Sequence, residues 1–407
     1  MPALETGQKR GHSCFLRHKN RNVPFSVLGC PPARASAVFR LAAGLLAGTL
    51  AGCSVLQLPG VQPAPPEAPV EQEPLPTTRF TLEDPKVNVV GDLQVIRSRE
   101  TDTFIDIAQA YHLGYDELVE ANPGIDPWLP GEGTPIVLPS RFVLPDAPRE
   151  GIVLNVASKR LFYYPKAEPG SVPIVYTFPI SIGVEGWATP LGTTRVTSKQ
   201  KDPVWRVPAS IRKEHAENGD PLPAVVPPGP DNPLGAYAMR LAIPGDYLIH
   251  GTNKPAGVGM RISHGCIRMN PDDIEWLYPQ VPIGLPVHIV NQPVLIGIAG
   301  DELYLEAHAG LEEDKTRRTA AMLKAIEKRF GTLAKQGAAV DYERVAQISN
   351  EKRGIPVSIM TAGLDLDAAV TAAPRVTNIV TYDWFAREPA QSPAPVTAEA
   401  GRPVATE

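Results

Sequence analysis

The segment from residue 150 to 292 constrains the fold most, because short apolar runs there alternate with glycine and proline. Ile152, Leu154 and Val156 occupy every second position, as on a strand with one buried face. A similar alternation returns within residues 172–180. Several short strands separated by such turns predict a β-sandwich or another mixed β-fold rather than repeated βαβ units. We therefore predict a mainly β, sandwich-like domain over residues 150–292.

Two smaller units flank this domain in the predicted multidomain chain. Residues 89–140 predict a βααβ unit, with a strand at 93–96, a helix at 104–111 that Thr101 and Asp102 can cap, a second helix from Tyr115, and a strand at 135–139. Residues 293–387 predict a small α/β appendage, with a hairpin formed by 295–299 and 303–306 and a helix through Ala320, Leu323, Ile326, Phe330 and Leu333. Residues 388–407 are rich in proline and alanine and predict a disordered tail.

The first 53 residues have the layout of an export signal. Residues 41–50 are apolar but too few to span a bilayer, and Arg34 and Arg40 precede them. The run ends in Leu50-Ala51-Gly52-Cys53, which resembles the lipobox of bacterial lipoproteins. This resemblance implies that Cys53 is lipidated and anchors the protein to a membrane; the alternative is an ordinary signal peptide in which Cys53 is incidental. Residues 54–88, where proline is frequent, predict an extended linker.

Composition excludes some classes of partner. The net charge is −5, from 39 basic and 44 acidic residues, so the chain lacks the positive charge expected of a nucleic-acid-binding protein. Of its four cysteines, only Cys266 lies in the predicted folded region, and no CxxC pair is present. Because no fourth ligand is suitably spaced, a metal site is disfavoured. We expect no metal and no cofactor.

Residues 249–270 contain the chemistry. His250 precedes Cys266 by 16 residues, and His264 precedes it by two. A cysteine reacts as its thiolate, which a nearby imidazole makes accessible at neutral pH. Gly265 lets the backbone approach closely, so that consecutive amides from His264 to Cys266 can face a developing oxyanion. The pattern favours acyl transfer, although a lone buried cysteine is more often inert.

The whole motif resembles the L,D-transpeptidase family, which has a YkuD-type catalytic domain. The matching residues are His250 followed by Ser263-His264-Gly265-Cys266 and Ile267-Arg268-Met269-Asn270, and the stretches GIVLNVASKRLFYYP and PAVVPPGPDNPLGAYAMRLA. The segment DTFIDIAQAY, with its PIVLP exit, resembles a LysM module. That second resemblance implies glycan binding by residues 89–140; the alternative is a structural extension without a ligand.

The family resemblance implies roles for seven residues near the motif. Cys266 matches the nucleophile and His250 the general base, and the carbonyl of Gly251 matches the group that orients this histidine. Ser263, His264 and Gly265 match the supporting positions, although His264 can equally serve only to hold the loop. Arg268 matches the substrate-binding position; its alternative is a structural ion pair with Asp272 or Asp273. No role is expected for the four remaining histidines of the folded region: His112, His215, His288 and His308.

The implied activity is peptidoglycan transpeptidation through a Cys266 thioester, with release of D-alanine from a tetrapeptide stem. The acceptor is then a diaminopimelate amine, giving a 3–3 crosslink, or the lysine of a wall-linked lipoprotein; water would make the protein a carboxypeptidase. A periplasmic location follows from the signal and the substrate. Two alternatives stay open: a peptidoglycan-binding scaffold with an inactive domain, and a cysteine hydrolase acting on another substrate.

Overall fold

The computed structural model describes residues 71–311, 323–328, 331 and 339–381. The predicted signal segment, Cys53 and the tail at 388–407 lie outside the described residues, as do Ala320, Phe330 and Leu333 of the predicted C-terminal helix. No helix in the described ranges is long and apolar enough to cross a membrane.

Residues 150–292, the expected catalytic region, are mainly β, as predicted, and contribute most of a nine-stranded sheet. Its strand order is β1 (Arg79–Thr81), β8 (Ile174–Pro179), β7 (Arg160–Tyr164), β6 (Gly151–Asn155), β17 (Pro286–Val290), β10 (Gly192–Lys201), β13 (Tyr237–Leu241), β14 (Leu248–His250) and β16 (Ile267–Arg268). The two ends of β10 pair with different neighbours: its start pairs with β17 and its end with β13. A register shift between Val196 and Ser198 lies within the second pairing, and such bulges increase the local twist of a sheet.

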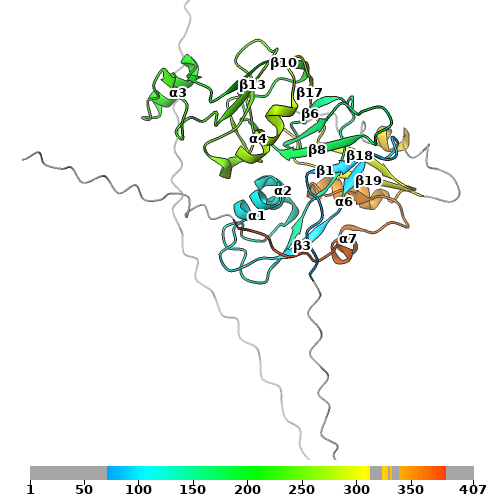
Figure 1. Cartoon of the computed structure of the whole chain (residues 1–407). Helices are drawn as coiled ribbons and strands as arrows, with labels where there is room; N and C mark the ends of the chain where they lie inside the picture. Colours follow the sequence, from blue (N-terminus) through cyan, green and yellow to red (C-terminus); the bar gives the residue numbers. More distant parts are fainter. Residues whose placement is uncertain (1–70, 312–322, 329–330, 332–338, 382–407) are drawn as a thin grey trace, which may run out of the picture. The chain divides into compact units, whose positions relative to one another are not determined.

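One face of this sheet packs against α4 (Pro271–Gln280) (Figure 1). Ile152 and Leu154, from the alternating segment, are fully buried there with Ile249 and Ile267. Pro271 opens the helix at a position where its missing N–H costs no hydrogen bond. The core therefore fixes β14 and β16, the two strands next to the motif.

The prediction of a linker up to residue 88 is wrong. Residues 79–81 form β1, which pairs antiparallel with β8, and β2 (Val89–Gly91) follows and pairs with β5 (Arg141–Val143). Phe80 lies edge-on to Phe142, with 6.2 Å between ring centroids. β1 supplies the backbone partners that β8 would otherwise lack at the edge of the sheet.

Residues 94–138 have the βααβ order. The elements are β3 (Gln94–Arg97), α1 (Phe104–Ala110), α2 (Tyr115–Ala121) and β4 (Pro135–Leu138), and the two strands pair antiparallel. Helix α1 begins at Phe104, as predicted, but its N-cap is Thr103 rather than Thr101 or Asp102: the Thr103 side chain accepts from the Asp106 N–H, and the Asp106 carboxylate accepts from the Thr103 N–H. The unit shares its core with the sheet, since Phe104 and Leu118 belong to one buried cluster with Val153 and Phe162 of β6 and β7.

The C-terminal unit has the predicted hairpin, β18 (Val294–Ala299) and β19 (Glu302–Ala307), extended by β20 (Val357–Ser358). Residues 323–328 are helical, as predicted, with Ile326 buried, and α6 (Tyr342–Glu351) and α7 (Leu366–Ala372) follow. Its core includes Leu93, Val95 and Val137 of the βααβ unit. The remaining elements belong to the catalytic region: β9 (Ile182–Gly183), β11 (Trp205–Arg206), α3 (Ala209–Glu217), β12 (Val225–Val226), the 3-10 helix η1 (Pro255–Gly257) and β15 (Arg261–Ser263).

Candidate active site

Strand β14 ends at His250 and pairs with β16, which begins directly after Cys266. The strands pair in parallel, with Ile249 opposite Ile267 and His250 opposite Arg268. Both isoleucines point into the core, so the alternation of a strand turns His250 and Arg268 to the other face. Continued one residue before β16, the same register places Cys266 opposite Leu248, two residues before His250. With strands ~4.8 Å apart and a rise of ~3.3 Å per residue, the two Cα atoms lie about 8 Å apart, a separation that an imidazole and a thiol can bridge.

The ring of His250 is held as a neutral base. Its Nδ1 lies 2.6 Å from the carbonyl oxygen of Gly251. Because a carbonyl only accepts, Nδ1 carries the proton, and the lone pair is on Nε2. Burial, assisted by the charge of Arg268, lowers the pKa of His250 to about 3. The imidazole is therefore neutral at physiological pH and able to receive a proton.

Cys266 is partly exposed, and its Sγ donates to the carbonyl of Asp246 at 3.3 Å. Burial raises the pKa of this thiol, although the backbone of Leu248 and the charge of Arg268 act in the opposite direction. The resting pair is thus a thiol and a neutral imidazole. The thiolate expected from the motif is therefore not the favoured form at rest.

The turn before Cys266 requires glycine. Gly265 has φ +97°, and a Cβ there would lie 2.8 Å from the ring of Tyr247. Ser263 Oγ accepts from the Gly265 N–H at 3.2 Å and donates to the Cys266 carbonyl at 2.5 Å. Of the three amides expected to face an oxyanion, that of Gly265 is therefore already bonded. The N–H groups of His264 and Cys266 have no hydrogen-bond partner among the described residues, and both are available to an oxyanion.

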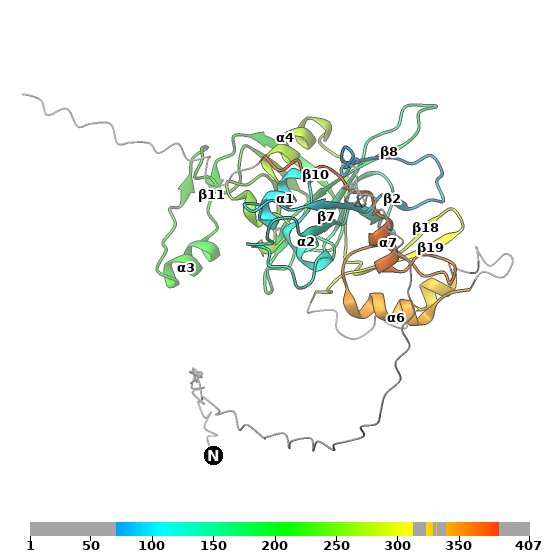
Figure 2. The ribbon, with the colours of Figure 1, turned by 90° about the horizontal axis from the view of Figure 1, so that it is seen from below.

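His264 is held by two residues that the sequence did not single out. Its Nε2 lies 3.2 Å from Glu214 Oε2, and its ring meets that of Trp187 edge to face, with centroids 5.1 Å apart. Glu214 belongs to α3, which lies on an excursion away from the main sheet in both ribbon views (Figures 1 and 2). No local pattern marks Glu214, because it lies 50 residues from its partner.

Arg268 does not form the ion pair that was its alternative role. No carboxylate in the described part of the chain pairs with it, and Asp273 is instead bound by His112 and by Asn270. The Nε atom of Arg268 is buried without a hydrogen-bond partner among the described residues. A guanidinium that pairs with no described carboxylate and lies opposite His250 in the strand pairing suits a carboxylate ligand.

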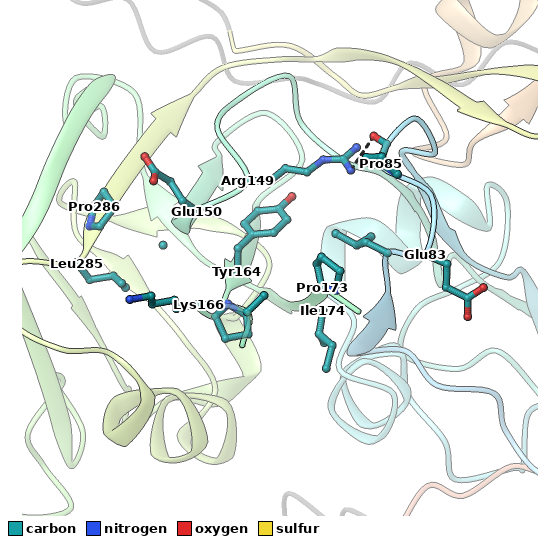
Figure 3. A pocket seen from close by; sticks show the side chains of 14 residues that line it. Glu83, Pro85, Arg149, Glu150, Tyr164, Lys166, Pro173, Ile174, Leu285 and Pro286 are labelled. Carbon is teal, nitrogen blue, oxygen red and sulfur yellow. Dashed lines mark hydrogen bonds between the residues drawn. The ribbon is translucent and has the colours of Figure 1, made fainter. Parts of the chain in front are cut away.

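A cavity of about 690 Å³ lies elsewhere and contains none of these residues (Figure 3). Tyr164 lies in the middle of its lining, and Arg149 reaches across to the carbonyl of Pro85. The volume of a cavity therefore does not identify the site; the motif does. No cluster of three or more His, Cys, Asp or Glu side chains able to hold a metal occurs in the residues that the structure covers.

Comparison with known proteins identifies the family. The family model of the L,D-transpeptidase catalytic domain, YkuD, matches residues 149–289. A probable L,D-transpeptidase of Salmonella typhimurium, ErfK/SrfK, is 38% identical over 271 residues, which are 65% of this chain and 84% of that protein. Two from Escherichia coli K12, YcfS and YbiS, are 41% and 43% identical and cover 62% and 58% of this chain and 79% and 74% of their own. The chain belongs to the L,D-transpeptidase family.

Proposed function

We propose that this L,D-transpeptidase uses Cys266 as its nucleophile and His250 as its general base. One observation carries the proposal: β14 pairs with β16 so that His250 lies opposite Arg268, two residues after Cys266, while Nδ1 of His250 is committed to the Gly251 carbonyl. The opposite nitrogen, Nε2, is thereby the proton acceptor. This arrangement supports a thiol that is deprotonated as it attacks.

In the first step, Cys266 Sγ attacks the carbonyl carbon between the L-centre of diaminopimelate and the terminal D-alanine of a tetrapeptide stem. The thiol proton passes to His250 Nε2, and the carbonyl oxygen becomes an oxyanion that faces the free amides of His264 and Cys266. The C–N bond then breaks, His250 returns the proton to the departing amine, and D-alanine leaves. A thioester on Cys266 remains.

In the second step, an acceptor amine attacks the thioester and gives its proton to His250, and Cys266 leaves as the thiol. The amine belongs to a diaminopimelate side chain of another stem, giving a 3–3 crosslink, or to the lysine of a wall-linked lipoprotein. Arg268 binds a stem carboxylate through its unpaired donors. No step requires a metal or cofactor.

We further propose that the enzyme acts in the periplasm, lipid-anchored through Cys53, and that the βααβ unit binds glycan. The lipobox-like sequence Leu50-Ala51-Gly52-Cys53 supports the anchor. Trp128, 58% exposed, lies beside Tyr115 with 6.5 Å between ring centroids, and exposed aromatic faces suit sugar rings. Retention on glycan strands stripped of stem peptides, lost in Trp128→Ala, tests this binding.

The decisive experiment incubates the purified protein with disaccharide-tetrapeptides and compares it with Cys266→Ala. We expect crosslinked dimers and free D-alanine from the native protein and neither from the variant. Trimmed stems alone would instead favour the hydrolase alternative. An unchanged substrate, together with no mass adduct on Cys266 after exposure to a carbapenem, would favour an inactive scaffold.

A further inference from the structure

The turn between α1 and α2 of the βααβ unit contacts the catalytic region at two points. At the first, His112 Nδ1 lies 2.7 Å from Asp273 Oδ1. The Asp273 side chain is almost fully buried, and its other oxygen accepts from Asn270 Nδ2 at 3.1 Å. His112 itself has φ +52°, and its carbonyl accepts from Arg160 Nη2 at 2.9 Å, so the histidine is fixed at both ends.

This first contact holds the chain directly after the motif. Asn270 is the N-cap of α4 and is separated from Arg268 by Met269 alone. The Met269 N–H donates to the carbonyl of His250 at 2.9 Å. Asp273 and Asn270 thus link His112 to Met269, the residue whose N–H holds the backbone carbonyl of His250.

The second contact holds the segment between His250 and Cys266. The Tyr115 N–H donates to the carbonyl of Val258 at 3.3 Å. Gly114 and Gly259 touch through their backbones: a Cβ on Gly259 would lie 2.4 Å from the Gly114 Cα. This approach is possible only because both residues lack a side chain.

We propose that residues 112–115 are a positioning element for catalysis, with His112 as its main positioning residue. They brace the two segments that lead into and out of the Cys266 turn, and so hold the nucleophile and its base in register. This role rests on the proposed function of Cys266 and His250. It is separate from any glycan binding by the same unit. A misplacement of about 1 Å in a catalytic pair can slow a reaction by about 100-fold, so a modest loss of bracing is measurable.

The test compares His112→Ala with His112→Asn in the full chain, using acylation of Cys266 by a carbapenem followed by intact mass. The final extent of acylation reports the folded fraction, and the rate reports positioning. We expect His112→Ala to reach the native extent with a maximal rate about tenfold lower and an unchanged half-saturating concentration. His112→Asn should stay within about twofold of the native rate, because an asparagine amide can replace Nδ1 as donor and tolerates positive φ.

Arg97→Ala is the matched control. Its guanidinium donates to the Gly133 carbonyl within the same unit, away from the catalytic segments, and we expect a native rate. Gly114→Ala tests the second contact independently: φ −84° accepts alanine, but the new Cβ would lie 3.0 Å from Gly259 Cα, so acylation should slow.

The proposal would be overturned if His112→Ala and Gly114→Ala were both acylated at the native rate. It would also be overturned if these variants lost only the final extent of acylation and kept its rate. If His112→Ala does not fold, the rate of Gly114→Ala decides. If the native protein itself is not acylated, the proposed function of Cys266 fails. That outcome differs from failure of the positioning proposal, in which the native protein is acylated and the variants match its rate.

Discussion

Replacement of Glu117 by glutamine should strongly destabilise the fold, because Glu117 is the counter-ion of a buried arginine. The Arg160 side chain is 1% exposed and that of Glu117 9%. Arg160 Nε and Nη2 lie 2.7 and 3.1 Å from the two Glu117 oxygens. The guanidinium also donates to Thr177 Oγ1 and to the His112 carbonyl and lies 4.1 Å over the ring of Phe142. The pair joins α2 to β7, that is, the βααβ unit to the catalytic sheet.

Glu117→Gln keeps the volume but leaves this guanidinium with neutral acceptors only. Removing one partner of a buried ion pair costs about 3–5 kcal/mol. At about 2–4 °C per kcal/mol, the expected fall in Tm is about 6–20 °C. Replacing both partners, in Glu117→Gln/Arg160→Met, should recover most of this loss, because an apolar substitute for a buried pair is often close to neutral.

Thermal unfolding followed by circular dichroism measures these values. The matched control is Glu217→Gln, which removes the acid of the exposed Lys213–Glu217 pair and should change Tm by less than about 2 °C. A Glu117→Gln protein that melts within about 2 °C of the native protein would refute the reasoning. So would a separate early transition that leaves the main one unchanged, because the shared core predicts that both regions unfold together.

Three further predictions concern the site. The pKa of His250 is about 3 in the folded protein and near 6.5 in the unfolded chain, so the neutral base should persist across pH 5–8. The rate of acylation should therefore not fall as pH drops through 6.5. A tenfold loss of rate per pH unit below 6.5 would contradict this. Because of the same pKa shift, the unfolded chain binds a proton below about pH 6.5 that the folded chain does not, so the free energy of unfolding should fall as pH drops. The denaturant concentration at the unfolding midpoint should therefore be lower at pH 5 than at pH 7. Gly265→Ala should abolish acylation, because φ +97° and the ring of Tyr247 exclude a Cβ; a native acylation rate in this variant would show that the turn is not as rigid as described.

More of the site than of the fold could be predicted from the sequence, because the patterns that mark the site are local. His250 at a strand end, the Ser263-to-Cys266 motif and a glycine that permits close approach can all be read along the chain. The alternation in residues 151–155 likewise predicts a strand buried on one face, and the structure has β6 there, but with both faces covered. The βααβ unit covers the second face of β6, and no sequence pattern within β6 predicts this contact.

What the sequence by itself determined is therefore the chemistry and the kinds of element: a cysteine, a histidine sixteen residues before it, and short strands. Tertiary structure alone decided the partners. Residues assigned to a linker became β1; His112 and His308, expected to have no role, meet Asp273 at 2.7 Å and Glu120 at 3.9 Å. Burial alone would lower the pKa of His308, but the hydrogen bonds and charges of Glu120 and Glu306 outweigh it and raise this pKa to about 9. A contact between segments tens to hundreds of residues apart depends on which faces the fold brings together, and it leaves no periodicity in either segment.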